Sequence, residues 1–119
     1  MCSSDLYQVA TAGGTGTSSV TGDTTKFHIF TVIFDGSGAT NADRLKFRYD
    51  GADQTLNFGA TTVGTQTSGS TTTYYLGVDD TGAAGYWNGD MGAVIIYTRA
   101  LTTNELIGVE EYLSNFWGI

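Results

Sequence analysis

The three glutamates of this chain lie close together near its C-terminal end, at Glu105, Glu110 and Glu111. Hydrolysis of a glycosidic bond requires two carboxylates that face each other across that bond. Here all three fall in a segment whose apolar spacing predicts a helix, and no two aspartates occupy alternate positions of a predicted strand. The pattern argues against a glycan hydrolase. We therefore expect no catalytic residues and no enzymatic activity.

The single histidine, His28, lies within the most apolar predicted strand. A metal site needs several ligands, and a Ser-His-Asp triad needs a serine and an aspartate placed around the histidine. The serines of this chain lie in predicted loops. We therefore expect His28 to be a core residue whose ring is hydrogen-bonded.

Composition and charge restrict the class of partner. The 119 residues suffice for one domain, and they include 17 Gly and no Pro, with a net charge of -7 although only 14% are charged. Such a surface repels nucleic acid and anionic membranes, and no apolar run is long enough to span a bilayer. The acidity fits a neutral partner such as a sugar polymer; the alternative is that it only supports solubility.

Alternating or continuous apolar residues predict short β-strands joined by glycine-rich turns, at 7–11, 26–34, 44–49, 54–58, 73–78 and 91–97. Both faces of 26–34 are apolar, which predicts a central strand covered on both sides. The alternation in 44–49 predicts a half-buried strand, with Arg44, Lys46 and Arg48 on its solvated face. Asp50-Gly51 predicts a tight hairpin. Segments 12–25 and 79–85 predict loops, and 61–63 a short edge strand.

A helix is predicted from Thr102 almost to the C-terminal residue. Thr102 followed by Glu105 matches a capping box. Gly108 weakens the helix by about 1 kcal/mol relative to Ala, and Gly118 suits its C-terminal end. The spacing places four apolar residues on one face: Leu106, Val109, Leu113 and Phe116.

Four segments, taken in chain order, resemble parts of laminin G-like, concanavalin A-like lectin and glucanase domains of bacteria and their phages. They are FHIFTVIFDGSG, RLKFRYDG, YYLGVDDTGAAGYWNGDMGAVIIYTRAL and LTTNELIGVEEYLSNFWGI. The resemblance implies an all-β fold, an antiparallel β-sandwich (jelly roll) truncated at its N-terminus, with one C-terminal α-helix. Glucanases that share this fold carry Glu-x-Asp-x-x-Glu on one strand, and this chain has no such pattern.

The resemblance also suggests where ligands bind. Related domains hold Ca²⁺ through loop aspartates, which makes Asp79, Asp80 and Asp90 the candidate metal ligands; the alternative for Asp90 is a turn cap. Aromatic rings can stack on a sugar, so Tyr75, Tyr86, Trp87 and Asn88 form the candidate ligand-binding surface. The alternative for Trp87 is packing on the core, as at the matching family position. Tyr74 and Trp117 are further aromatic candidates, and packing of the helix end is the preferred role for Trp117.

The first six residues resemble one translated frame of a sequencing adapter, so we interpret 1–6 as a non-native leader and 7–119 as a single domain. Cys2 is the only cysteine, which excludes an internal disulfide. We expect a non-enzymatic carbohydrate-binding or adhesion module of a larger bacterial or phage extracellular protein, with a glycan or cell-surface polysaccharide as partner. The alternative is a structural or receptor-binding element of a phage tail or surface assembly, at the virion surface. Missing strands predict an exposed strand edge and a homodimer; the alternative is a monomer whose loop 12–25 folds over the gap.

Overall fold

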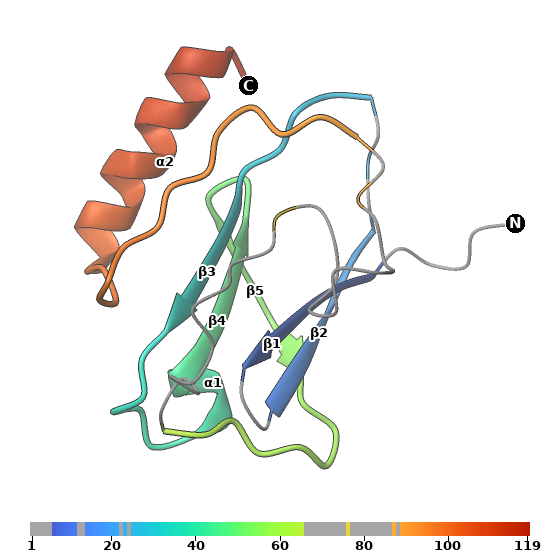
Figure 1. Cartoon of the computed structure of the whole chain (residues 1–119), viewed down its shortest axis with the longest axis vertical. Coiled ribbons are helices and arrows are strands. Elements are labelled where there is room, and N and C mark those ends of the chain that lie inside the picture. The colour runs from blue at the N-terminus through green and yellow to red at the C-terminus, as the bar shows by residue number, and fades with distance from the viewer. Residues whose placement is uncertain are drawn as a thin grey trace, which may run out of the picture.

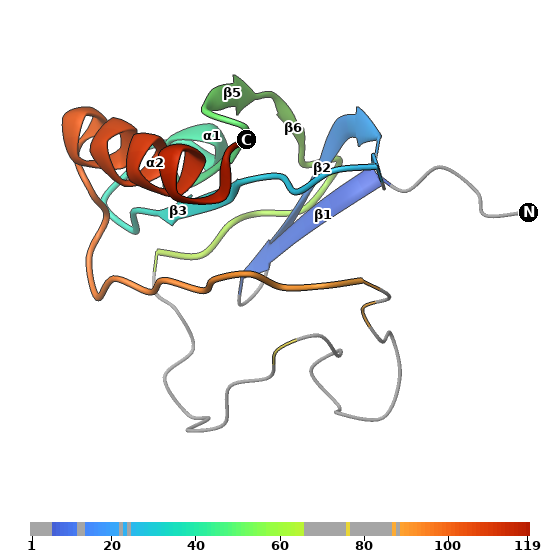
Figure 2. The same ribbon diagram turned by 90° about the horizontal axis from the view of Figure 1, so that it is seen from above.

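The computed structural model describes residues 6–11, 14–21, 23, 25–65, 76, 87 and 89–119. Within these residues, the strands pair antiparallel in two three-stranded sheets, with the orders β1-β2-β6 and β3-β4-β5. β3 lies between α2 and the pair formed by β1 and β2 (Figures 1 and 2). The elements in chain order are β1 (Leu6–Thr11), β2 (Gly14–Thr21), β3 (Phe30–Phe34), α1 (Asn41–Arg44), β4 (Leu45–Tyr49), β5 (Ala52–Gln54), β6 (Leu56–Asn57) and α2 (Thr103–Trp117).

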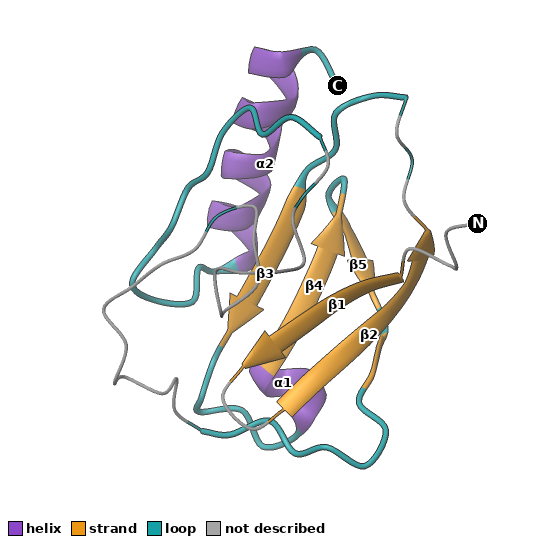
Figure 3. Cartoon of the chain, turned by 45° about the vertical axis from the view of Figure 1, so that its right-hand side comes forward, coloured by secondary structure: helices purple, strands orange, loops and turns teal. Residues whose placement is uncertain are grey.

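The described residues form a small mixed α/β domain, so the prediction of an all-β jelly-roll sandwich is wrong. The two sheets have three strands each, and a helix of 15 residues packs beside one of them (Figure 3). Residues 91–97, predicted as a strand, belong to neither sheet. A run of β-branched residues favours extended backbone, but it becomes a strand only where a neighbour supplies hydrogen-bond partners.

Other strand predictions fail for the same non-local reason. The predicted loop 12–25 contains β2, whose Gly, Ser and Thr residues pair with β1. The segment 26–34 is not a central strand, because β3 stands at the edge of its sheet order in the described part of the chain. The predicted strand 54–58 divides into β5 and β6, which belong to different sheets.

Among the described residues, the buried core is small and centres on β4. Leu45 and Phe47 are 1% and 2% exposed, and they pack with Leu56 of β6 and with Val63. The predicted alternation of 44–49 is therefore confirmed for its apolar side. Val63 belongs to no strand, contrary to the edge strand predicted at 61–63, yet it is fully buried.

The hairpin between β4 and β5 turns at Asp50-Gly51, as predicted. Tyr49 pairs with Ala52, and both turn residues have positive φ, 48° at Asp50 and 78° at Gly51. A two-residue turn of this kind matches the right-handed twist of the strands. The Asp50 carboxylate accepts the Ile29 N–H at 2.8 Å, which ties the turn to the chain that enters β3.

Helix α2 begins and ends as predicted. The Thr102 side chain accepts the Glu105 N–H while the Glu105 side chain accepts the Thr102 N–H, which confirms the capping box. Gly118 closes the helix with φ 69°. Its buried face differs from the prediction, because Phe116 is 66% exposed and Glu110 is 6% exposed.

Candidate functional site

An open groove of about 480 Å³ runs between α2 and the extended segment that precedes it. The segment contributes every second residue, which is the spacing of one face of an extended chain. The helix contributes residues spaced by three, four and seven, which is the spacing of one helical face. The lining residues are Ile95, Tyr97, Arg99, Leu101, Glu105, Gly108, Val109 and Tyr112.

The groove is mostly apolar and has two aromatic side chains within reach of solvent. Tyr97 and Tyr112 are 49% and 60% exposed. Tyr112 also stacks on Phe116, with ring centroids 6.0 Å apart, so the aromatic surface continues beyond the groove along α2. The groove is therefore open to solvent, and its lining is mostly apolar.

An ion pair forms the polar end of the groove. The Arg99 guanidinium donates to both oxygens of the Glu105 carboxylate, at 2.9 and 2.7 Å. The hydrogen bonds from Arg99, followed by those from Thr102, lower the pKa of Glu105 to about 2. Hydrogen bonding to Glu105 raises the pKa of Arg99 in turn. The pair is therefore ionised over the physiological range and carries no net charge.

Local sequence explains how the ion pair is positioned. Thr102 begins the helix and fixes Glu105 through the capping box, one turn into α2. The short connector places Arg99 three residues before the cap, and its side chain reaches Glu105 across that turn. The Glu105 carboxylate thus caps the helix, pairs with Arg99 and lines the groove.

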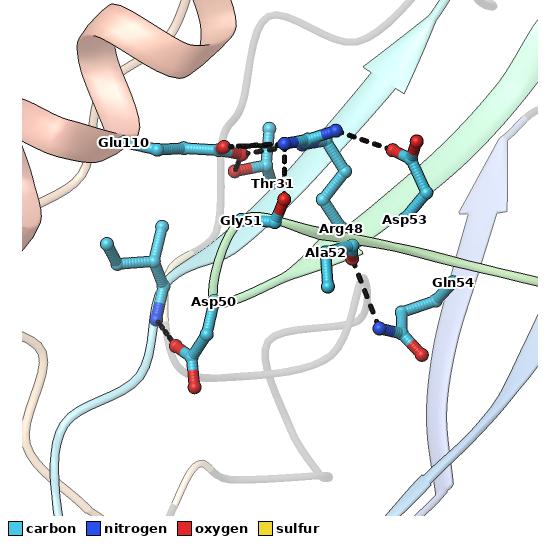
Figure 4. Close-up of polar contacts among 9 residues, drawn as sticks. Thr31, Arg48, Asp50, Gly51, Ala52, Asp53, Gln54 and Glu110 are labelled. Carbon is cyan, nitrogen blue, oxygen red and sulfur yellow. Dashed lines mark hydrogen bonds and ion pairs between the residues drawn. The ribbon is translucent and has the colours of Figure 1, made fainter.

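A second polar cluster joins α2 to the β3-β4-β5 sheet (Figure 4). Arg48 of β4 and Glu110 of α2 are 8% and 6% exposed, and the Arg48 Nε lies 2.9 Å from Glu110 Oε1. Arg48 also donates to Asp53 Oδ1 at 2.6 Å and to the Gly51 carbonyl, while the Thr31 hydroxyl donates to Glu110 at 2.8 Å. Hydrogen bonding to Glu110 raises the pKa of Arg48. The predicted solvated face of β4 is therefore wrong at Arg48, because α2 covers it.

His28 is a buried, hydrogen-bonded residue, as predicted. Its side chain is 5% exposed, its Nδ1 lies 2.7 Å from Asp50 Oδ2, and its ring stacks on Tyr49 at 4.8 Å. Because a carboxylate only accepts, Nδ1 carries the proton in this bond. Nε2 lies 3.5 Å from Asp23, whose pKa is lowered by hydrogen bonds from Thr25. The arrangement fastens the β4–β5 turn to the start of β3.

The sequence-predicted ligand and metal residues are mostly outside the described residues. This applies to Tyr75, Tyr86, Asn88, Asp79 and Asp80. Trp87 is 48% exposed and meets Phe30 edge-on, with ring centroids 6.3 Å apart. Asp90 is exposed. The structure thus brings none of the predicted site residues together within its described part.

Trp117, a further aromatic candidate, packs at the end of α2, which is the role that the sequence analysis preferred for it. Its ring centroid lies 5.6 Å from that of Phe27. A Cβ added at Gly92 would lie 2.9 Å from the Trp117 ring, so this ring lies close against the 91–97 segment. Trp117 therefore anchors the helix end to the chain that borders the groove.

The groove residues were not among the predicted site residues, although the sequence contains a signal for them. Tyr97 and Arg99 share one face of an extended chain, and Glu105 and Tyr112 share one face of the helix. Tyr112 also falls outside the predicted apolar face of the helix. A tyrosine on the polar face of an amphipathic helix is a surface aromatic, which marks a candidate contact residue.

Neither a metal-binding cluster nor a membrane-spanning helix is found in the described part of the chain. There, no three or more His, Cys, Asp or Glu side chains gather closely enough to hold a metal ion. No helix in that part has the length and apolar character needed to cross a bilayer.

Comparison with known proteins gives no relative. No family model matches the chain, and neither a curated protein nor a solved structure matches it.

Proposed function

We propose that this chain is a non-enzymatic carbohydrate-binding module and that the groove between 95–101 and α2 holds the sugar. The observation that carries the proposal is the pairing of Tyr97 and Tyr112 with a charge-neutral Arg99–Glu105 pair in one groove. Aromatic rings offer an apolar face to the C–H side of a sugar ring, and the planar ion pair offers donors and acceptors to its hydroxyls.

The engagement of the glutamates supports binding over catalysis. Glu105 is held by Arg99 and the helix cap, and Glu110 is held by Arg48 and Thr31. A general acid must carry a proton near the working pH, and the lowered pKa of Glu105 is unsuited to that role.

The test is a glycan array followed by isothermal titration calorimetry, each run with and without Ca²⁺. We expect binding to neutral glycans, and we expect Tyr112→Ala to weaken it at least fivefold, which corresponds to about 1 kcal/mol. Trp87→Ala is the comparison variant, since Trp87 belongs to the surface predicted from sequence and not to the groove. Binding that is lost in Trp87→Ala and kept in Tyr112→Ala would move the site away from the groove. A Ca²⁺ requirement would support the predicted metal-binding role of Asp79, Asp80 and Asp90.

A second candidate function is a structural element of a phage tail or surface assembly. It is favoured by Val94 and Ile96, which are 50% and 71% exposed on the face of the 91–97 segment opposite the groove. Exposed apolar residues on extended backbone are suited to contact with another chain, including a second copy. Light scattering over a concentration series, with Ile96→Lys as the matched variant, tests this function. A monomer at every concentration would contradict it.

A further inference from the structure

A second pocket, of about 380 Å³, lies between α2, the β4–β5 turn and the chain that enters β3. We call it the helix–turn pocket, and it shares no lining residue with the groove. Among the described residues, five charged side chains line it: Lys26, Arg48, Asp50, Glu110 and Glu111. What the pocket can bind depends on which of these charges already have a partner within the protein.

Three of the five charged side chains are engaged by the fold. Arg48 and Glu110 form the buried ion pair, with Arg48 Nη2 2.9 Å from Glu110 Oε2 (Figure 4). The Asp50 carboxylate accepts the Ile29 N–H at 2.8 Å and lies 2.7 Å from the Nδ1 of His28. These three groups therefore leave no free charge for a ligand.

The other two, Lys26 and Glu111, are exposed and carry opposite charges. Neither side chain forms an ion pair in the described part of the chain, with the other or with a third residue. Lys26 attracts the Asp23 carboxylate electrostatically without a hydrogen bond, and the Ser114 hydroxyl is taken up by the Ile119 carbonyl. One cation and one anion thus stand at the same pocket without an ion-pair partner.

Apolar side chains supply the rest of the pocket wall. Phe27 and Ile107, from opposite sides of the pocket, are 42% and 39% exposed, and Ile29 lies between the two. A ligand that removes this surface from water gains from the hydrophobic effect. A ligand with only a negative charge would meet Glu111, and one with only a positive charge would meet Lys26. The lining therefore suits a ligand that carries both charges and an apolar group.

We propose that the helix–turn pocket binds a small zwitterion, an α-amino acid with an apolar side chain. Lys26 donates to the carboxylate of the ligand, Glu111 accepts from its ammonium group, and Phe27 and Ile107 cover its side chain. Hydrogen bonds between charged groups are stronger than those between neutral ones, and the two long side chains can adjust to a small ligand. This site is independent of the sugar-binding groove and of the function proposed for it.

The experiment is an amide NMR titration of the full chain with leucine, N-acetylleucine and leucinamide. The second probe lacks the ammonium group and the third lacks the carboxylate. We expect leucine to bind more tightly than either, and Lys26→Gln and Glu111→Gln each to raise its Kd by about threefold or more, as for loss of an exposed ion pair. Lys46→Gln is the matched control, because Lys46 is exposed on β4 and does not line the pocket; it should leave the Kd unchanged.

Crossing the variants with the probes separates recognition from a structural effect. In Glu111→Gln, leucine should bind no more tightly than N-acetylleucine, and in Lys26→Gln no more tightly than leucinamide. A variant that weakens all three probes equally would show a structural role and refute the assignment of that residue. The proposal is refuted if leucine shifts no amide signal of the unchanged chain, or if the three probes bind it equally. Tyr112→Ala should leave leucine binding unchanged, since Tyr112 lines only the groove, so this proposal and the sugar-binding function can fail separately.

Discussion

Replacing Arg48 with Met tests how α2 is held on the sheet. Among the described residues, the change leaves the Glu110 carboxylate, which is 6% exposed, with only the Thr31 hydroxyl as a side-chain hydrogen-bond partner. Removing one member of a buried ion pair typically costs about 3–5 kcal/mol, because the remaining charge stays desolvated. Domains of this kind have a total free energy of unfolding of about 5–15 kcal/mol, so Arg48→Met should remove a large part of it.

Replacing Glu110 with Leu should lower the free energy of unfolding by less than Arg48→Met does. In Glu110→Leu, Arg48 keeps Asp53 and the Gly51 carbonyl as partners, so the loss should lie near about 3 kcal/mol or below. The double variant Arg48→Met with Glu110→Leu should recover most of the stability, since apolar side chains of similar volume often replace a buried pair without loss. Asp53→Asn is the control, because the Asp53 side chain is 83% exposed and an exposed pair contributes at most about 1 kcal/mol.

Urea unfolding followed by circular dichroism at 222 nm measures these changes. With a slope of about 1–3 kcal/mol per M, a loss of 3 kcal/mol lowers the midpoint by about 1–3 M. The reasoning is refuted if Arg48→Met unfolds within about 1 kcal/mol of the unchanged chain. It is equally refuted if the double variant is less stable than either single one.

Two further predictions concern the helix cap and the core. The pKa of Glu105 is lowered from its usual 4.5 to about 2, so its stabilising contribution is complete above pH 4.5 and is lost as the pH falls toward 2. Helix content measured by circular dichroism should therefore fall in this window, and the pH dependence should flatten in Glu105→Gln; an unchanged profile would exclude Glu105 as its source. Leu45→Ala should lower the free energy of unfolding by about 2–5 kcal/mol, because Leu45 is 1% exposed at the centre of the core. A thermal midpoint within a degree or two of the original would show that this core contributes little.

The features that could be predicted from sequence are those specified by neighbouring residues. The capping box of Thr102 and Glu105, the Asp50-Gly51 turn and the alternation of Leu45 and Phe47 each involve residues at most three apart. Both partners of each of these interactions lie within a few residues of each other, so the local sequence is enough to predict them. These elements appear in the structure where the sequence places them.

The features that failed depend on partners far along the chain. β2 is poor in apolar residues and exists because β1 and β6 pair with it. Residues 91–97 are rich in strand-forming residues, yet no described strand pairs with them. The sequence predicts Arg48 on the solvated face of its strand, but in the structure α2 covers it and Glu110 pairs with it.

The sequence does contain a signal for one long-range contact, the pairing of Glu110 with a basic residue. Glu110 falls between Val109 and Leu113 on the apolar face of the helix, and a carboxylate there requires a buried cation on the opposing element. That requirement points to the basic residues of the strand at 44–49. Which of them supplies the cation is fixed only by how the helix crosses the sheet.

The contact between Arg48 and Glu110 joins residues 62 positions apart, and this separation governs the order in which the protein opens. Closing a flexible loop of that length costs about 4 kcal/mol of chain entropy, whereas the β4–β5 hairpin closes locally. Undocking of α2 regains that entropy, so the lowest partial opening releases the helix while β3, β4 and β5 stay paired. Amide hydrogen exchange should then be faster throughout α2 than in β4. Because α2 forms one wall of the groove, an occupant of the groove should slow exchange in the helix and leave β4 unchanged.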